Sequence, residues 1–146
     1  MSHVATIKAE IKSLNTLKKA CKKLNLEFIE NQKTYKWFGK HVGDYPIPEG
    51  FTINDMGRCE HAIKVPGAKY EIGVVKDPLN PKNYKLIWDF WDRNLPKILG
   101  KDAWKLTQRY ELEQGKEAAK KKGWIPKEVV MEDRIRLEIE IPDYLG

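Results

Sequence analysis

The chain has 146 residues, of which 27 are Lys or Arg and 21 are Asp or Glu, so its formal net charge is +6. This length fits one domain, and an apolar share of 41% excludes a disordered tail. A mean hydropathy of −0.62 without a long apolar run excludes a transmembrane helix. The first residues lack the apolar core of a secretory signal, so we expect a cytoplasmic protein.

Two helices and several strands are predicted in chain order. Residues 4–11 alternate with period two, which is typical of a strand with one buried face. Ser13 is the expected N-cap of an amphipathic helix over 14–24, and Asn25 is its expected left-handed stop. Strands are then expected over 26–30, 61–65, 70–74 and 84–91, with a further short one at 35–38.

The second helix is expected to run from Asp102, its predicted N-cap, to Lys122, with Gly123 as its stop. Its predicted inner stripe is Ala103, Leu106, Tyr110 and Ala118. Gly115 weakens this helix by about 1 kcal/mol relative to Ala, and a close backbone approach would explain it. A terminal hairpin follows, with the apolar positions of residues 135–141 facing inward.

These elements predict one α+β domain over residues 1–146, with an irregular excursion at about 39–58. Two helices cannot cover both faces of so many strands. We therefore expect a two-layer sandwich in which both helices lie on one face of a twisted, mostly antiparallel sheet. The strand–helix–strand–strand rhythm indicates two ferredoxin-like halves.

Several segments resemble the plastid "hypothetical chloroplast reading frame 35" family, a domain of unknown function that also occurs in bacteria and bacteriophages. The matching segments are Met1-Ser2-His3, Thr6-Ile7-Lys8, Leu17 to Cys21, Tyr70 to Val74, Tyr84 to Trp91, Leu106 to Tyr110, Gly123-Trp124 and Ile135-Arg136-Leu137.

Three features set this chain apart within that resemblance. The stretch 37–58 is similar to the longer version in bacterial and phage members. Glu111 follows Tyr110 where the family has Ala, and Glu132-Asp133-Arg134 replaces its Asp-Gly turn. The resemblance implies a cytosolic single domain, and it implies no catalytic residues.

The cysteine and histidine residues do not form a recognisable catalytic or metal-binding pattern. Cys59 and His61 have no CxxC or HxxxH partner, so we expect neither a metal nor another cofactor. Cys21 lies on the inner stripe of the first helix and is expected to be inert. A catalytic triad is not indicated, and an enzymatic activity is left open, with a binding role favoured.

Asp89 lies between Trp88 and Phe90 in a predicted strand, which is an unusual place for a carboxylate. A salt bridge with Arg109 or a Lys, or a capping role, is the expected explanation. A small polar pocket is the alternative, and its candidate ligand-binding residues are His3, Asp89, Trp91, Gln108, Arg109 and Tyr110.

Excess positive charge lies on the two predicted helices, and this fits an anionic partner or an ordinary solvated helix face. The candidate basic surface comprises Lys18, Lys19, Lys22, Lys23, Lys120, Lys121 and Lys122. The first functional hypothesis is a non-enzymatic binding module that presents an aromatic and basic surface to a partner protein or an anionic ligand. Alternatives are a small nucleotide- or phosphate-binding protein or enzyme, and a nucleic-acid-binding protein. A homodimer is also expected, and no membrane association.

Overall fold

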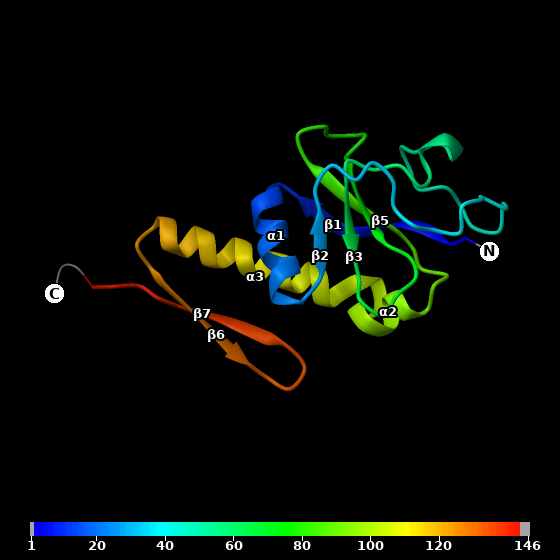
Figure 1. The fold of residues 1–146 in the computed structure, drawn as a ribbon. Helices are drawn as coiled ribbons and strands as arrows, with labels where there is room; N and C mark the ends of the chain where they lie inside the picture. The colour runs from blue at the N-terminus through cyan, green and yellow to red at the C-terminus, as the bar shows by residue number, and fades with distance from the viewer. Residues whose placement is uncertain (1, 144–146) are drawn as a thin grey trace.

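Five antiparallel strands form the main sheet of the computed structural model, which describes residues 2–143. They are β1 (Val4–Ile11), β2 (Glu27–Ile29), β3 (His61–Lys64), β4 (Ile72–Lys76) and β5 (Tyr84–Asp89). Their order across the sheet is β1-β5-β4-β3-β2, so β1 and β2 are its two edges (Figure 1). The predicted α+β class and the antiparallel sheet are confirmed.

The two long helices, α1 (Leu14–Lys23) and α3 (Trp104–Lys121), contribute to one core on one face of this sheet. Leu17 of α1 and Leu106 of α3 are buried there against Ile7 and Ile72. Ser13 caps α1 as predicted, because its hydroxyl accepts a hydrogen bond from the Thr16 N–H at 3.2 Å. Asn25 and Gly123 adopt the predicted left-handed conformation, with φ of 58° and 75°.

The start of the second long helix was predicted wrongly. A separate short helix, α2 (Asn94–Leu99), precedes it and is followed by a 3-10 turn, η2 (Lys101–Ala103). Asp102 and Ala103 both have positive φ, and α3 begins only after them, with Ala103 and not Asp102 as the N-cap residue. Ala118 is exposed, and Ala119 takes its place in the buried stripe.

The whole segment between β2 and β3, residues 30–60, contains the predicted excursion and is called the excursion from here on; it covers the other face of the sheet. Tyr35, Met56 and Cys59 are buried there against Ala62 and Ile87. Trp37, Ile47 and Phe51 pack around them, and η1 (Ile53–Asp55) is the one regular turn of the excursion within the described residues. The predicted short strand at 35–38 is reduced to an isolated bridge between Thr34 and Arg58. The interior strand β5, which lies between β1 and β4, is therefore covered on both faces.

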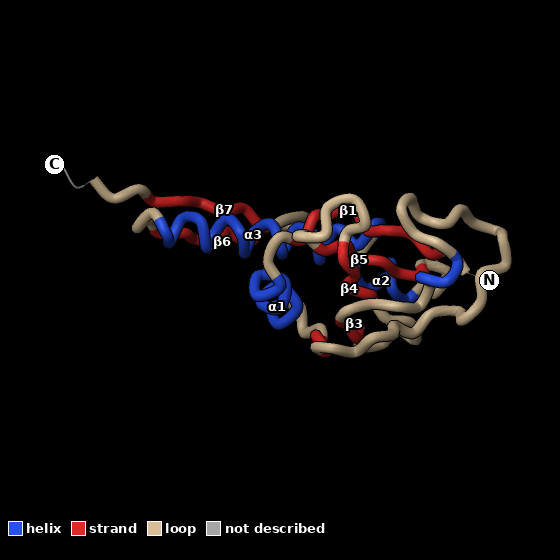
Figure 2. The backbone as a smooth tube through the Cα atoms, turned by 90° about the horizontal axis from the view of Figure 1, so that it is seen from above, coloured by secondary structure: helices blue, strands red, loops and turns tan. Residues whose placement is uncertain are grey.

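The terminal hairpin of β6 (Ile125–Val130) and β7 (Ile135–Glu140) forms a second sheet that packs on α3. Figure 2 shows this hairpin and the adjoining half of α3 extending away from the main sheet. Gly115 allows the approach, because a Cβ there would lie 2.7 Å from Leu137. Ile139 and Ile141 are exposed, contrary to their predicted inward orientation.

The topology departs from two ferredoxin-like halves. The strands β1 and β2, which flank α1 in the chain, lie at opposite edges of the sheet, and the strands after α3 do not enter the sheet at all. Within residues 2–143, no helix has both the length and the apolar character that a membrane span requires.

Candidate functional site

The six candidate ligand-binding residues fall into two separate groups. His3, Asp89 and Trp91 lie together where β1 begins and β5 ends. Tyr110 lies near the opposite end of β1, because its hydroxyl accepts the N–H of Lys12. Nine residues of extended chain span roughly 30 Å. The expectation of one pocket that contains all six residues is therefore not met.

Asp89 has a structural role at the first of these places. Its side chain is 0% exposed. One carboxylate oxygen accepts the N–H groups of His3 at 2.9 Å and Trp91 at 3.1 Å, and the other accepts that of Phe38 at 3.1 Å. The predicted salt bridge with Arg109 is wrong, and the predicted capping role holds. Asp89 joins the N-terminal segment, the excursion and the end of β5.

Four rings form an aromatic cluster beside Asp89, namely His3, Tyr45, Phe90 and Trp91. The His3 ring stacks on Tyr45 with centroids 4.9 Å apart and meets Trp91 edge-on at 4.9 Å. Tyr45 in turn meets Phe90 edge-on at 5.2 Å. The His3 Nε2 lies 3.2 Å from a carboxylate oxygen of Asp44. The excursion is thus fixed to the end of β5 by aromatic contacts.

A groove of about 650 Å³, here called the β1–α2 groove, opens next to this cluster. It lies between the edge strand β1 on one side and α2 with η2 on the other. Its apolar lining consists of Ala5, Ile7, Tyr45, Trp88, Phe90 and Pro96. The volume is in the usual range of small-ligand sites.

The charged lining of the β1–α2 groove is mostly positive. It comprises Lys8, Arg93, Lys97, Lys101 and a single acid, Asp102. Within residues 2–143 none of the four cations makes a salt bridge. The groove therefore combines an apolar floor with unneutralised positive charge.

Asp92 positions the helix α2, which contains Lys97 and follows directly after Arg93. One Asp92 carboxylate oxygen accepts the N–H of Asn94 at 3.1 Å, at the start of α2. The other accepts the N–H groups of Lys69 and Tyr70 at 2.8 and 3.0 Å, which ties the helix to the segment before β4. Gly100, with φ of 84°, ends the helix.

Sequence reasoning missed α2, and with it the cations of the groove. A signal was present, because Leu95, Ile98 and Leu99 have helical spacing after Asp92. Pro96 within this stretch argues against a helix, but proline is tolerated in the first turn of a helix, which is where Pro96 lies.

The second predicted group has structural partners. The Tyr110 hydroxyl accepts the backbone N–H groups of Lys12 and Ser13 at 2.9 and 3.3 Å, just before α1. Gln108 lies in a shallow depression beside the turn between β6 and β7. Arg109 pairs with Glu128 of β6 at 2.8 Å.

A network of ion pairs fixes the terminal hairpin to α3. Lys116 bonds to Glu128 at 2.9 Å and to the buried Glu113 at 3.3 Å, and Arg109 lies 3.6 Å from Glu113. The hydrogen bond from Lys116 is the main cause that lowers the pKa of Glu128, and the same bond raises the pKa of Lys116. This part of the candidate site therefore serves to hold the hairpin.

The predicted basic surface is divided among three places. Lys19, Lys22, Lys23 and Lys120 line a groove of about 540 Å³ between α1 and α3, together with Lys116, Glu113 and Glu117. Lys18 instead pairs with Glu30, and Lys122 lies over the Trp124 ring. Lys121 lies close enough to Glu117 to help lower its pKa, after the larger effect of the hydrogen bond from Lys19.

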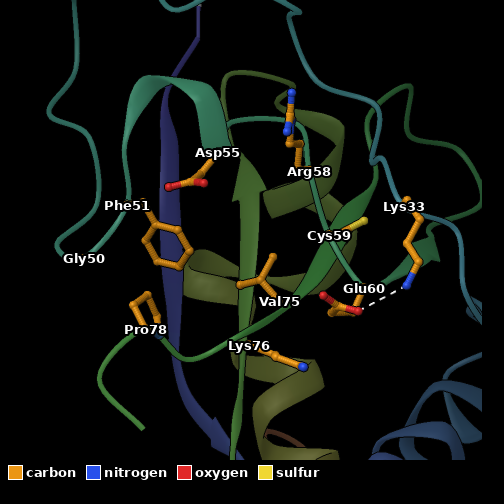
Figure 3. A pocket seen from close by; sticks show the side chains of 10 residues that line it. All are labelled: Lys33, Gly50, Phe51, Asp55, Arg58, Cys59, Glu60, Val75, Lys76 and Pro78. Carbon is orange, nitrogen blue, oxygen red and sulfur yellow. Dashed lines mark hydrogen bonds and ion pairs between the residues drawn. The ribbon is translucent and has the colours of Figure 1, made fainter. Parts of the chain in front are cut away.

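A further pocket, of about 480 Å³, lies on the sheet face that the excursion covers. Figure 3 shows the ion pair of Lys33 and Glu60 at one side of it and the Phe51 ring at the other. Cys59 lines this pocket, but its thiol donates to the Gln32 carbonyl at 3.1 Å and burial raises its pKa to about 12. A thiol with that pKa is not a nucleophile at neutral pH.

Among residues 2–143, no three His, Cys, Asp or Glu side chains come together in a way that would hold a metal ion. No protein-family model matches the chain, and no curated protein or solved structure is significantly similar to it.

Proposed function

We propose that this protein is a non-enzymatic binding module, and that it holds an anionic ligand with an apolar or aromatic body in the β1–α2 groove. The observation that carries the proposal is the combination of Trp88 and Phe90 on the floor with four cations around them that have no ion-pair partner among residues 2–143. Apolar burial supplies most of the affinity in such a site, and the cations select the charge of the ligand.

The ionisable groups of the groove suit binding better than proton transfer. Lys8, Arg93, Lys97 and Lys101 are donors, and Asp102 lies on a turn of positive φ at the rim. General acid–base catalysis needs a base near neutral pH within reach of a substrate. The lining of the groove within the described residues contains no His, Cys or Glu side chain.

The alternative of a small nucleotide-binding protein uses the same groove, because a base stacks on aromatic rings and phosphates pair with Lys and Arg.

A nucleic-acid-binding role is favoured by a different observation, namely the groove between α1 and α3. Five lysines and two glutamates line it, and Lys22, Lys23 and Lys120 have no acidic partner among the described residues. Binding there would weaken steeply with salt.

Membership of the chloroplast reading frame 35 family, a cytoplasmic setting and a homodimer remain part of this proposal. A homodimer is tested by light scattering over a range of protein concentrations, and a constant monomer mass would contradict it.

Titration with 8-anilinonaphthalene-1-sulfonate, an aromatic anion, tests the proposed site. We expect the amide resonances of Ala5, Ile7 and Trp88 to shift in the NMR spectrum, and those of the pocket in Figure 3 to stay unchanged. The double variant Lys97→Glu/Lys101→Glu should bind about tenfold more weakly, which corresponds to about 1.4 kcal/mol.

The matched control changes the same charge in the other groove. Lys22→Glu/Lys23→Glu alters the net charge equally but lies on α1, away from the β1–α2 groove. It should leave the affinity for the sulfonate within about twofold, since exposed charges at that distance are screened. Equal weakening by both double variants would overturn the proposed site.

A further inference from the structure

The β1–α2 groove runs along an unpaired sheet edge. Its lining includes four consecutive residues of β1, from Ala5 to Lys8. Since β1 is the outermost strand of the sheet, one side of its backbone has no partner strand among the described residues. Such an edge is a template for pairing with another extended chain.

The pairing register shows which backbone groups face outward. The Phe90 N–H donates to the His3 carbonyl at 2.9 Å, and Ala5 lies opposite Trp88 and Ile7 opposite Leu86. In an antiparallel pair, bonded and non-bonded residue pairs alternate. His3, Ala5 and Ile7 therefore bond to β5, and the N–H and C=O groups of Val4 and Thr6 point away from the sheet. The register shifts between Ile7 and Ile11, so this alternation applies only up to Ile7.

The short helix leaves this edge accessible. A helix of six residues is about 9 Å long, whereas the eight residues of β1 span about 26 Å. Only part of the edge can lie under α2. The part of the β1 edge that α2 does not cover borders the groove, whose floor is formed by Trp88 and Phe90.

The charges of the groove define the chemistry of the occupant. Arg93, Lys97 and Lys101 lie on the helix side and Lys8 on the strand side, against Asp102 alone. An extended chain paired with β1 points successive side chains alternately toward the helix side and toward the strand side. Acidic side chains would therefore meet Arg93, Lys97 and Lys101 on the helix side and Lys8 on the strand side. Apolar side chains on the helix side would contact the aromatic floor.

We propose that an extended segment of a partner protein, rich in acidic and apolar residues, pairs with β1 as a sixth strand of the sheet. Backbone bonds to Thr6 fix its register, and the four cations select acidic side chains. This inference rests on the proposed function, because it names the ligand of the same groove.

The test uses fluorescein-labelled hexapeptides made of Glu and Val in every order, with the corresponding Lys and Val set as the control for charge. We expect members of the acidic set to bind and the basic set to bind at least tenfold more weakly. The tightest peptide is then N-methylated at alternate backbone nitrogens, in two versions that modify either the odd or the even positions. One version should bind at least fivefold more weakly than the parent peptide, because it lacks the N–H groups that pair with β1.

A protein variant tests the same contact from the other side. Thr6→Pro removes an outward N–H and leaves the bonds to β5 in place, and proline is tolerated on a sheet edge for this reason. It should weaken the peptide at least fivefold, and peptide binding as tight as that to the unchanged protein would contradict pairing through the Thr6 N–H. The peptide arm does not depend on this variant, so it decides the question even where the variant does not fold.

The outcomes separate the two proposals. Strand pairing is overturned if no acidic peptide binds, or if both N-methylated versions bind as tightly as the parent peptide. Sulfonate binding would in that case still support the groove as a binding site. If the sulfonate does not bind to the groove either, the proposed function fails with it.

Discussion

Replacement of Asp89 tests whether its carboxylate is part of the framework or part of a binding site. Two variants divide the question. Asp89→Ala removes the acceptors of all three backbone N–H groups, and Asp89→Asn keeps one oxygen but places an amide NH₂ where the second oxygen accepted from Phe38. Neither change adds volume at this fully buried position.

The magnitude follows from the number of N–H groups left without a partner. A buried donor that loses its acceptor costs about 1–3 kcal/mol. Asp89→Asn leaves one such donor, so we expect a loss of about 2 kcal/mol. Asp89→Ala leaves three, two of which share an oxygen, so we expect about 3–6 kcal/mol. That is a large part of the 5–15 kcal/mol that stabilises a typical domain.

Urea denaturation followed by tryptophan fluorescence measures both losses, and thermal unfolding gives a second estimate. For a chain of this size, about 2 kcal/mol lowers Tm by roughly 4–8 °C. Asp133→Asn is the matched control, because Asp133 is exposed in the turn between β6 and β7. If Asp89→Asn were as stable as Asp133→Asn and lost ligand affinity instead, Asp89 would be a binding residue and the structural reasoning would be refuted.

Three further predictions concern α3 and the hairpin. Tyr110→Phe should lose about 1–2 kcal/mol in urea denaturation, because two N–H groups before α1 lose their acceptor; an unchanged midpoint would contradict this. The pKa of Glu128 in the folded protein lies below its ordinary value of 4.5. The ionised carboxylate therefore stabilises the fold above pH 4.5, and this stabilisation is lost as the pH falls through the pKa of the folded state. The free energy of unfolding should therefore decline below about pH 4.5, and Glu128→Gln should flatten this decline. Gly115→Ala gains up to about 1 kcal/mol of helix propensity and displaces the flexible end of Leu137, so the Leu137 methyl resonances should shift while Tm changes by less than roughly 4 °C.

The sequence predicted the elements of the sheet well because each strand carries its own pattern. Residues 4–11 alternate, and the alternation places Ile7 and Ile11 on the face that α1 and α3 cover. In β5 both faces are apolar, and the structure buries Leu86 on one side and Ile87 on the other. These patterns are local, so they survive without knowledge of the neighbouring strands.

The place of the terminal hairpin could not be predicted in the same way. Alternation identified 135–141 as a strand, but it does not say which sheet the strand joins. What fixes the hairpin on α3 is a set of specific contacts, with Leu137 on Gly115 and Glu128 on Arg109 and Lys116. None of these pairs has a spacing that a sequence pattern would reveal.

Asp89 shows what a sequence can and cannot say about a site. Its position between Trp88 and Phe90 marked it as unusual, and the structure agrees that it is buried. Its partners are the backbone N–H groups of residues 3, 38 and 91, and backbone groups carry no side-chain signature. A salt bridge with Arg109 was therefore the natural expectation and the wrong one.

The position of the β1–α2 groove follows from how the two aspartates anchor the chain around it. Asp89 fixes the excursion and the start of β1, which places Tyr45 at one end of the groove. Asp92 fixes the start of α2, which places Arg93 and Lys97 along the other side. Asp89 is the last residue of β5 and Asp92 follows three residues later, so one short segment fixes both sides of the groove. Because these cations are exposed and form no ion pair with an acid among residues 2–143, their charge remains available to a ligand that enters along the edge of β1.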